Sequence, residues 1–535
     1  MADNVTRRFP GSELWLIAGS LAVAAGFVLF LCLVFGAKWE TNDDVAMSMV
    51  AHGYGVAAFG SPNLIFSNVL WGYLVRAIPQ INGTLGYSTA TLAVLIIVGS
   101  VLLFGMYELR AGAIASLSAF ALLMARPVLF PQFTINAGLL TIGAIVCWRL
   151  FALQFDRKAL FAGCVLAFAA YLVRRNEFLL LFFVALPLVP WRILFQRRSF
   201  QVSILALAAA IALSGVIDRK AYEGPEWKAF NELNAVRAPF NDFGADQYLK
   251  KRPDIMAGFG FSANDIDLIR EWFFVDPKIA NPRALKGMLD KLGPLPSQQN
   301  AIANGWAGVQ TLWDPKLLPL ALTALLLALL RPSWQAAASW GLCIGAVFLM
   351  GLSGRPGILR VYVPLTSLLV IAPFLAKQVA DSRNRLLTGV LLLAMVVNTS
   401  LVFAESKTLQ DSVEKTRQEL DGFPRGPVVI WGIGFPLEDV YPVAGASPST
   451  MSCRFYGLGA FTLAPFSVAY KEQQKGRGMI DLLSKEKGVP IVANERCIKC
   501  LEIYCKEHLH GEMEELSSQR FGEVTVSWRR CEPGS

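Results

Sequence analysis

Long apolar runs dominate the hydrophobic pattern along this chain. Each run holds roughly 16 to 23 residues and is bounded by charged residues, Pro or Gly, as expected for a helix that crosses the hydrocarbon core of a bilayer. The pattern predicts about eleven transmembrane helices, at 14–36, 87–107, 112–130, 134–151, 159–173, 177–191, 200–217, 316–331, 335–352, 358–376 and 384–403.

Composition agrees with a membrane protein. Hydrophobic residues make up 54% of the 535 residues and charged residues only 17%, with a mean hydropathy of +0.46. This predicts a polytopic α-helical membrane protein. The net charge of +9 does not indicate nucleic-acid binding, because the basic residues cluster in the short loops, where they act as topology signals.

The loop arginines and lysines predict the orientation. With a cytoplasmic N-terminus, the positive-inside rule is obeyed by the basic loop residues Arg149, Arg157, Lys158, Arg192, Arg197, Arg198, Arg331, Lys377, Arg383 and Arg385. The long polar segments 37–86, 218–315 and 404–535 then lie on the outer side, which is the periplasm for a bacterial inner membrane. We therefore expect a transmembrane module at 1–404 and a periplasmic domain at 405–535.

The tail pattern indicates a small α/β domain. A charged helix at 406–420 and a helix at 479–487 alternate with strands at 428–431, 490–492 and 524–528. Five cysteines lie in this tail, at Cys453, Cys497, Cys500, Cys505 and Cys531, and an outer compartment favours disulfides, whose pairing the sequence leaves open. A zinc site that combines Cys497 and Cys500 with His508 and His510 is the alternative.

Two adjacent carboxylates, Asp43 and Asp44, follow the first predicted span directly. One interpretation is structural: Thr41 or Asn42 caps a helix whose positive end the aspartates favour. The functional interpretation is that one carboxylate acts as general base on an acceptor hydroxyl while the other binds a metal ion or positions the acceptor.

Arginines that depart from the positive-inside rule form a second candidate. Arg174 and Arg175 precede Glu177 between two spans, and Arg355 and Arg360 lie between two later spans, all on the predicted outer side. Guanidinium groups suit a phosphate because they stay charged and bind bidentately. The alternatives are pairing with Glu177, contact with lipid phosphates, or simple interfacial anchoring.

Two weaker candidates lie in the outer segments. Arg237 belongs to a polar cluster in the large outer loop that a solvated surface would also explain, and His52 lies eight residues after Asp44, where a structural hydrogen bond is the ordinary role. The outer segments contain no Walker loop, GxSxG or HExxH, so nothing supports a nucleotide-driven pump or a familiar hydrolase.

Together these features resemble the GT-C class of membrane glycosyltransferases. The resemblance rests on the motif Glu40-Thr-Asn-Asp-Asp-Val-Ala-Met, the later Ile65-Phe-Ser-Asn-Val-Leu-Trp-Gly, and Glu226-Trp227 leading to Asn234 and Arg237. Like that class, the chain has an acidic motif in the first outer loop, then an interfacial helix at 63–78, further long outer loops and an outer C-terminal domain.

The resemblance implies an inverting transfer of a sugar from a polyprenyl-phosphate carrier to an envelope glycan or lipid acceptor. It implies Asp44 as the base, Asp43 in an assisting role and Glu177 as a substitute for the base. It implies phosphate binding by Arg174, Arg175 and Arg355, with Arg360, His52, Asn68, Arg237 and Tyr362 as further substrate contacts. It implies no specific cofactor and leaves a divalent metal ion open, and the expected partners are the lipid-linked donor, the acceptor and membrane lipids.

Two other functions fit a multispan protein of this kind. A lipid-glycan transporter or flippase would use the arginines to line a path and the aspartates to gate it. Such transporters usually show internal repeats and charges within spans, whereas we find no repeat and the spans are nearly free of charge. A glycan polymerase or ligase of the O-antigen type would also use polyprenyl-linked donors, and the early aspartate pair argues against it.

Overall fold

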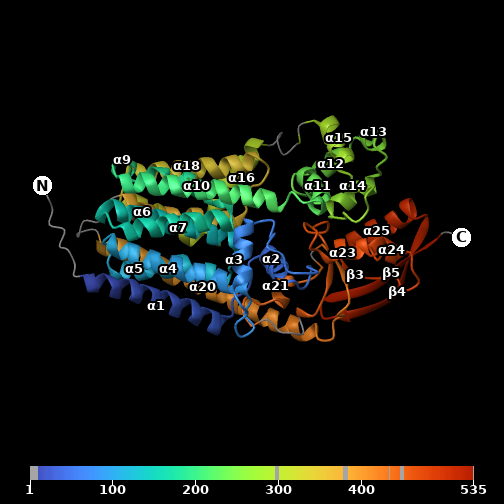
Figure 1. Ribbon diagram of the computed structural model, residues 1–535, viewed down its shortest axis with the longest axis horizontal. Helices are drawn as coiled ribbons and strands as arrows, with labels where there is room; N and C mark the ends of the chain where they lie inside the picture. Colours follow the sequence, from blue (N-terminus) through green and yellow to red (C-terminus); the bar gives the residue numbers. More distant parts are fainter. Residues whose placement is uncertain are drawn as a thin grey trace.

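The computed structural model describes residues 10–293, 295, 301–376, 384–432, 434–445 and 451–533. It contains a bundle of long helices with a domain of helices and one sheet at one end (Figure 1). We call that end of the bundle the domain end. The predicted loop residues Lys377 and Arg383 lie outside the described residues.

All eleven predicted spans coincide with helices. These are α1 (Pro10–Phe35), α4 (Gly86–Glu108), α5 (Ala113–Leu129), α6 (Phe133–Gln154), α7 (Arg157–Val173), α8 (Arg175–Ala185) continued by η1 (Leu186–Leu188), α10 (Arg198–Ala221), α17 (Leu318–Leu330), α18 (Trp334–Leu352), α19 (Leu359–Ala376) and α20 (Asn384–Glu419). Among the described residues, seven helices are long and apolar enough to cross a membrane: α1, α4, α6, α10, α18, α19 and α20.

An eighth crossing results if α16 (Ala301–Gln310) with η2 (Thr311–Trp313) and α17 count as one span, bent by 86°. Helices α5 and α7 have 17 residues each, which is at the lower limit for a crossing, and α8 has 11. The chain is thus a multi-pass membrane protein whose shortest predicted spans are confirmed as helices but not as full crossings.

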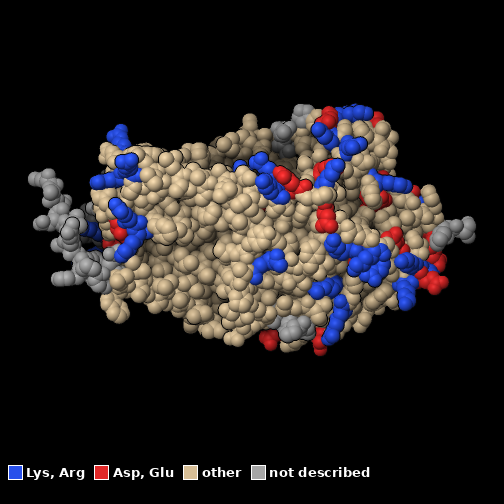
Figure 2. Space-filling model, viewed as in Figure 1, with Lys and Arg blue, Asp and Glu red and all other residues tan. Residues whose placement is uncertain are grey.

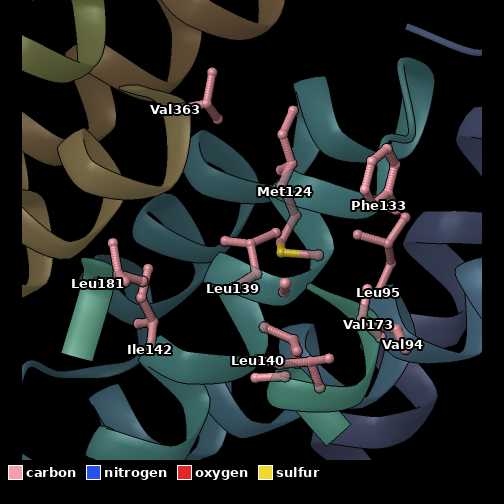
Figure 3. Close-up of a cluster of buried hydrophobic side chains, with 14 of the residues drawn as sticks. Val94, Leu95, Met124, Phe133, Leu139, Leu140, Ile142, Val173, Leu181 and Val363 are labelled. Carbon is pink, nitrogen blue, oxygen red and sulfur yellow. The ribbon is translucent and has the colours of Figure 1, made fainter. Parts of the chain in front are cut away.

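The bundle is organised around α6, which is buried along nearly its whole length. Side chains from α4, α5, α7, α8 and α19 pack around it in the cluster of Figure 3, which includes Leu95, Met124, Leu140, Leu181 and Val363. By contrast α1 and α10 are mostly exposed and carry apolar side chains outward, as lipid-facing helices do. In Figure 2 the face of the bundle between its two ends carries few charged side chains.

Short helices cover the domain end. The first outer segment forms α2 (Asn42–His52) and α3 (Val69–Ala77), the latter within the interfacial stretch expected at 63–78. After α9 (Trp191–Phe195) and α10, the large loop forms α11 (Pro225–Asn241), α12 (Ala245–Leu249), α13 (Pro253–Ala257), α14 (Ala263–Arg270) and α15 (Pro282–Leu292).

The C-terminal domain is the expected small α/β unit. Its sheet has the order β2-β1-β3-β5-β4, with β1 (Val428–Trp431) parallel to β2 (Phe455–Leu458) and β3 (Val489–Ala493), while β5 (Val524–Pro533) runs antiparallel to β3 and to β4 (Gly511–Phe521). The helices are α21 (Leu437–Val440), α23 (Val468–Gln474), α24 (Met479–Leu483) and α25 (Glu495–His508). The three predicted strands are confirmed as β1, β3 and β5.

The charged helix predicted at 406–420 is not separate. It continues the last span as the 36-residue helix α20, which at 1.5 Å per residue extends about 54 Å. The apolar run ends near 403, but helix-forming residues follow without Gly or Pro, so nothing stops the helix before Gly422. This rod joins the bundle to the sheet domain.

The extramembrane core draws on two distant segments. Phe273 of the large loop packs against Trp431 of β1 and Tyr504 of α25, with ring centroids 5.3 and 5.1 Å apart. Leu233, Leu285 and Met288 belong to the same core. Packing therefore joins the helices of 225–292 to the C-terminal sheet, across the boundary expected at residue 405.

One disulfide is formed in the tail, between Cys505 of α25 and Cys531 of β5. Cys497 and Cys500 are buried free thiols. His508 Nε2 lies 2.8 Å from Asp265 Oδ1. Within the described residues, the one group of side chains close enough to bind a metal ion is Asp265, Glu507 and His508, so the expected zinc alternative with Cys497 and Cys500 is not formed.

Candidate active site at the domain end of the bundle

The segment before α2 and the first turn of α2 are held by the end of α5, the α5–α6 connection and the start of α6. Lys38 N donates to Leu129 O at 2.9 Å, and Glu40 N donates to Pro131 O at 3.3 Å. The backbone N of Phe133 then donates to Asp44 Oδ1 at 3.0 Å. These contacts fix the direction in which α2 leaves the bundle.

Asp44 is a buried anchor. It is fully buried, and besides the bond from Phe133 its Oδ1 accepts from Tyr87 Oη at 3.0 Å, while its Oδ2 accepts from Thr41 Oγ1 at 3.2 Å. Burial raises the pKa of Asp44 to about 8, against the hydrogen bonds from Tyr87, Phe133 and Thr41, which lower it. Thr41 is the N-cap residue of α2, and its hydroxyl donates to Asp44 instead of capping the backbone.

Asp43 has the opposite environment. Its side chain is 27% exposed, and its Oδ2 accepts from Arg360 Nη1 at 2.8 Å. It lies in the first turn of α2, where the helix dipole favours a negative charge. Of the two aspartates, Asp43 is the one whose carboxylate reaches solvent.

Arg174 lies beside this ion pair. It connects α7 to α8, donates to Phe66 O at 3.3 Å, and its guanidinium lies 5.1 Å from the centre of the Phe133 ring. The charges of Asp43, Arg360, Glu177 and Arg355 all act on Arg174, which places the five side chains in one cluster. The sequence predicted every member of this cluster.

Glu177 is the buried member of the cluster. It is 3% exposed, its charge interacts with those of Arg174 and Arg360, and its Oε1 has no hydrogen-bond partner among the described residues. A Cβ on Gly138 of α6 would lie 3.4 Å from that oxygen, so α8 and α6 are in close contact there.

Arg355 forms the rim of the site facing the large loop. It forms an ion pair with Asp242, and its guanidinium lies 5.1 Å from the centre of the Phe243 ring. Gly354 and Gly357 flank it with φ values of +87° and +82°, a backbone conformation that favours glycine and turns the loop sharply. Arg355 therefore connects the cluster around Arg174 to the large loop.

Arg237 and Arg175 lie beside the cluster rather than in it. Arg237 donates to Asn234 Oδ1 at 2.8 Å and lies over the Trp272 ring. Arg175 is exposed and lines a groove of about 770 Å³ between the segment 65–68 that precedes α3 and the helices α8 and α10. The groove also contains Arg219 and the apolar side chains of Phe178, Leu179 and Val216.

Three of the expected substrate contacts make structural hydrogen bonds. His52 Nε2 accepts from Tyr87 N at 3.1 Å, and burial lowers the pKa of His52 to about 4, so the ring is neutral near pH 7. Asn68 caps α3 through Leu70 N and donates to Ser214 O. Tyr362 is fully buried and donates to Gly308 O at 2.8 Å.

Arg126 was missed by the sequence reasoning. It is 6% exposed, bonds both oxygens of Glu40 at 3.0 and 3.1 Å, and bonds Glu405 of α20 at 2.8 Å, while Lys316 bonds the other oxygen of Glu405. The network holds the residue three positions before Asp43. A charged residue inside a predicted span was the signal that could have identified it.

A metal ion shared by the aspartate pair does not fit the geometry. Oδ1 of Asp44 already accepts two hydrogen bonds and Oδ2 accepts one, so this buried carboxylate has little capacity left for a cation. Asp43 is paired with an arginine.

Comparison with known proteins gives little further guidance. No protein-family model matches the sequence, and no curated protein sequence does. Among solved structures, the chain is similar to a crystal structure of ArnT from Cupriavidus metallidurans bound to undecaprenyl phosphate, with 15% identity, a TM-score of 0.37 and coverage of 98% of both chains. A likeness at this identity concerns the fold alone, and at this TM-score we base no further statement on it.

Proposed function

We propose that this protein is an inverting glycosyltransferase, which moves a sugar from a polyprenyl-phosphate carrier to an envelope glycan or lipid acceptor at the periplasmic face of the bacterial inner membrane. The observation that carries the proposal is the solvent-reaching carboxylate of Asp43, set against Arg360 and Arg174 at one end of a membrane bundle. Displacement of a phosphate leaving group requires a base that deprotonates the attacking hydroxyl. It also requires positive charge close to the phosphate that leaves.

Asp43 is the general base in this proposal, and Asp44 positions it. The Asp43 carboxylate accepts the proton of the acceptor hydroxyl as that oxygen forms a bond to the anomeric carbon. The bond from the anomeric carbon to the phosphate oxygen breaks on the opposite face, and polyprenyl phosphate leaves with both electrons. Asp44 cannot take the proton readily, because it is buried and already holds three hydrogen-bond donors.

The arginines stabilise the leaving phosphate. Arg360 and Arg174 are adjacent to Asp43, and Arg355 borders them. Removing one preorganised donor from a developing negative charge typically costs a factor of about 10² to 10³ in rate. Arg360 also forms the ion pair with Asp43. When Arg360 binds the phosphate, Asp43 is released from this ion pair, so the two events are coupled through one side chain.

The groove of Arg175 and Arg219 supports a lipid-linked substrate. It combines two exposed arginines with the apolar side chains of α8 and α10, and α10 faces lipid along most of its length. An isoprenoid chain in the bilayer with a phosphate at the interface has matching chemistry.

The direct test is the lipid that remains bound. Protein purified in mild detergent is extracted and its lipids are analysed by mass spectrometry, followed by incubation of the protein with the identified lipid and an envelope extract. We expect a polyprenyl phosphate or its sugar conjugate, and loss of sugar from the lipid with gain by an acceptor. Recovery of phospholipids only, or movement of the conjugate across vesicles with no new glycosidic bond, would contradict the proposal.

A further inference from the structure

Three side chains of the types that bind metal ions meet where α14 of the large loop packs against the end of α25 (Figure 1). Asp265, Glu507 and His508 each offer one ligand atom, and these atoms all lie within 4.8 Å of one another. Asp265 and His508 are 243 positions apart in the sequence, so the fold brings them together. None of the three residues belongs to the proposed active site.

One serine orients both carboxylates. The backbone N of Ser262 donates to Asp265 Oδ2 at 2.9 Å, and its Oγ donates to Glu507 Oε2 at 2.7 Å. Each carboxylate thus has one oxygen held by Ser262 and one outside that contact. On Asp265 the second oxygen is Oδ1, which lies 2.8 Å from His508 Nε2. Hydrogen bonds that hold ligand side chains in this way are typical of metal sites.

The imidazole of His508 is held from the opposite side. Its ring stacks on Tyr504, with the ring centroids 4.9 Å apart and the planes inclined by 25°. Tyr504 is buried, and its Oη donates to Asp276 Oδ2 at 2.8 Å. The group therefore has a fixed side formed by Asp265 and His508, whereas Glu507 is exposed and borders the solvent.

The charges of the group favour a divalent cation. Even a protonated His508 supplies one positive charge, against the two negative charges of Asp265 and Glu507. An ion pair between His508 and Asp265 therefore leaves a carboxylate charge that Ser262, which is neutral, does not balance. A bound divalent ion balances both carboxylates with the imidazole neutral.

The kinds of ligand atom identify the ion. Calcium and magnesium are bound by oxygen ligands, whereas an imidazole nitrogen suits zinc and related transition metals. Zinc accepts both carboxylate oxygen and imidazole nitrogen, and three protein ligands leave its fourth position to water. The exposed side at Glu507 gives water access to that position.

We propose that Asp265, Glu507 and His508 bind one zinc ion, which fastens α14 to the end of α25. Ligand atoms at about 2.0 to 2.2 Å from a tetrahedral zinc ion lie about 3.3 Å from one another. Small rotations of the side chains bring the three atoms from their present spacing to that geometry. The ion joins the large loop to the C-terminal sheet domain, and the site is independent of the proposed sugar transfer.

The measurement is zinc binding by the detergent-solubilised full chain, stripped of metal with a chelator and freed of any affinity tag. Zinc, calcium or magnesium is then added, bound metal is determined by elemental analysis, and the melting temperature is recorded. We expect one zinc ion per chain and a rise in melting temperature with zinc that exceeds the rise with calcium or magnesium, because an ion that binds the folded state stabilises it.

Substitutions locate the ion. His508→Asn and Glu507→Gln each remove a ligand, and Ser262→Ala removes the hydroxyl that orients Glu507; we expect each to weaken zinc binding by at least about tenfold. Because Glu507 is exposed, Glu507→Gln should melt like the wild type when no zinc is present. His510→Asn is the matched control: His510 is exposed, lies outside the group and has a φ of +52°, which Asn tolerates. It should bind zinc as the wild type does.

Two results overturn the proposed zinc site. One is a wild type that zinc stabilises no more than calcium or magnesium does. The other is zinc binding that both His508→Asn and Glu507→Gln leave unchanged, which would place the ion elsewhere, for example at the thiols of Cys497 and Cys500. The proposed sugar transfer stands or falls by its own test in either case.

Discussion

Arg360 Nη1 lies 2.8 Å from Asp43 Oδ2, and this contact joins the start of α19 to the first turn of α2, 317 positions apart in the sequence. The neighbouring Asp44 is buried and bonded to Tyr87, Phe133 and Thr41. The two adjacent carboxylates therefore divide into one that can react and one that holds it in place.

Stability should depend on pH through Asp44. Its folded pKa is about 8 and its ordinary value 3.8, so between these values the folded protein keeps a proton that the unfolded chain releases. The contribution to stability is complete below about pH 4 and is lost as the pH rises to about 8, by up to about 1.4 kcal/mol per pH unit. His52, whose pKa is lowered, contributes the opposite slope below about pH 6.5.

Comparing wild type with Asp44→Asn isolates this effect. The amide is neutral at every pH, and we expect the fall in melting temperature between about pH 6 and 8 to be smaller in this variant. Asp43→Asn removes a charge that raises the pKa of Asp44, so its fall should lie between those of the wild type and Asp44→Asn. Parallel curves for wild type and Asp44→Asn would show that Asp44 is ionised when folded.

Arg360→Gln should lower kcat/KM for sugar transfer by about two to three orders of magnitude, because it removes charge from the leaving phosphate. Arg252→Gln is the control, since Arg252 is exposed and forms an ion pair with the nearby Asp254. Initial rates at varied donor concentration measure both. A loss below threefold for Arg360→Gln would exclude this arginine from the phosphate site.

Arg126 should contribute strongly to stability. Arg126→Leu leaves Glu40 and Glu405 without their buried partner, for which we expect a loss of about 3 to 5 kcal/mol. Lys316→Leu removes a cation that is 47% exposed and should cost less than about 1 kcal/mol. Denaturant unfolding in detergent compares the two, and equal losses would refute a central role for Arg126.

The orientation in the membrane is testable with two new cysteines. Ser518 on β4 and Lys158 at the start of α7 are exposed at opposite ends of the molecule. We expect Ser518→Cys to react with an impermeant maleimide in spheroplasts, and Lys158→Cys to react only after the inner membrane is opened. The reverse pattern would place the aspartate pair in the cytoplasm.

Much of this fold could be predicted, because an apolar run long enough to cross a bilayer has little alternative to forming a helix. The clustering of Asp43, Arg174, Glu177, Arg355 and Arg360 also followed from sequence, since charges at the ends of neighbouring spans on one side of a membrane have to meet. The short length of α8 could not be predicted from the sequence. Leu186 and Pro187 continue the apolar run, whereas the α-helix ends at Ala185 and the chain tightens into the 3₁₀ helix η1.

The roles within the aspartate pair could not be predicted. Adjacent helix residues point about 100° apart, so one carboxylate enters the bundle and the other does not, and which one enters depends on Tyr87 and Phe133, distant in sequence. The motif had led us to expect Asp44 as the base, whereas its burial makes Asp43 the better proposal. The strands β2 and β4 were missed because β2 has only four residues and β4 is mostly polar.

The central claim is that Asp43 is the base and Asp44 its anchor, and sugar transfer by the purified Asp43→Asn and Asp44→Asn variants tests it most directly. Both substitutions preserve shape, and an Asn at 44 can still accept from Tyr87 and Phe133. We expect Asp43→Asn to reduce kcat by about two to four orders of magnitude while donor binding persists, and Asp44→Asn to keep at least about a tenth of wild-type activity. Full transfer by Asp43→Asn, with none by a folded Asp44→Asn, would contradict the claim.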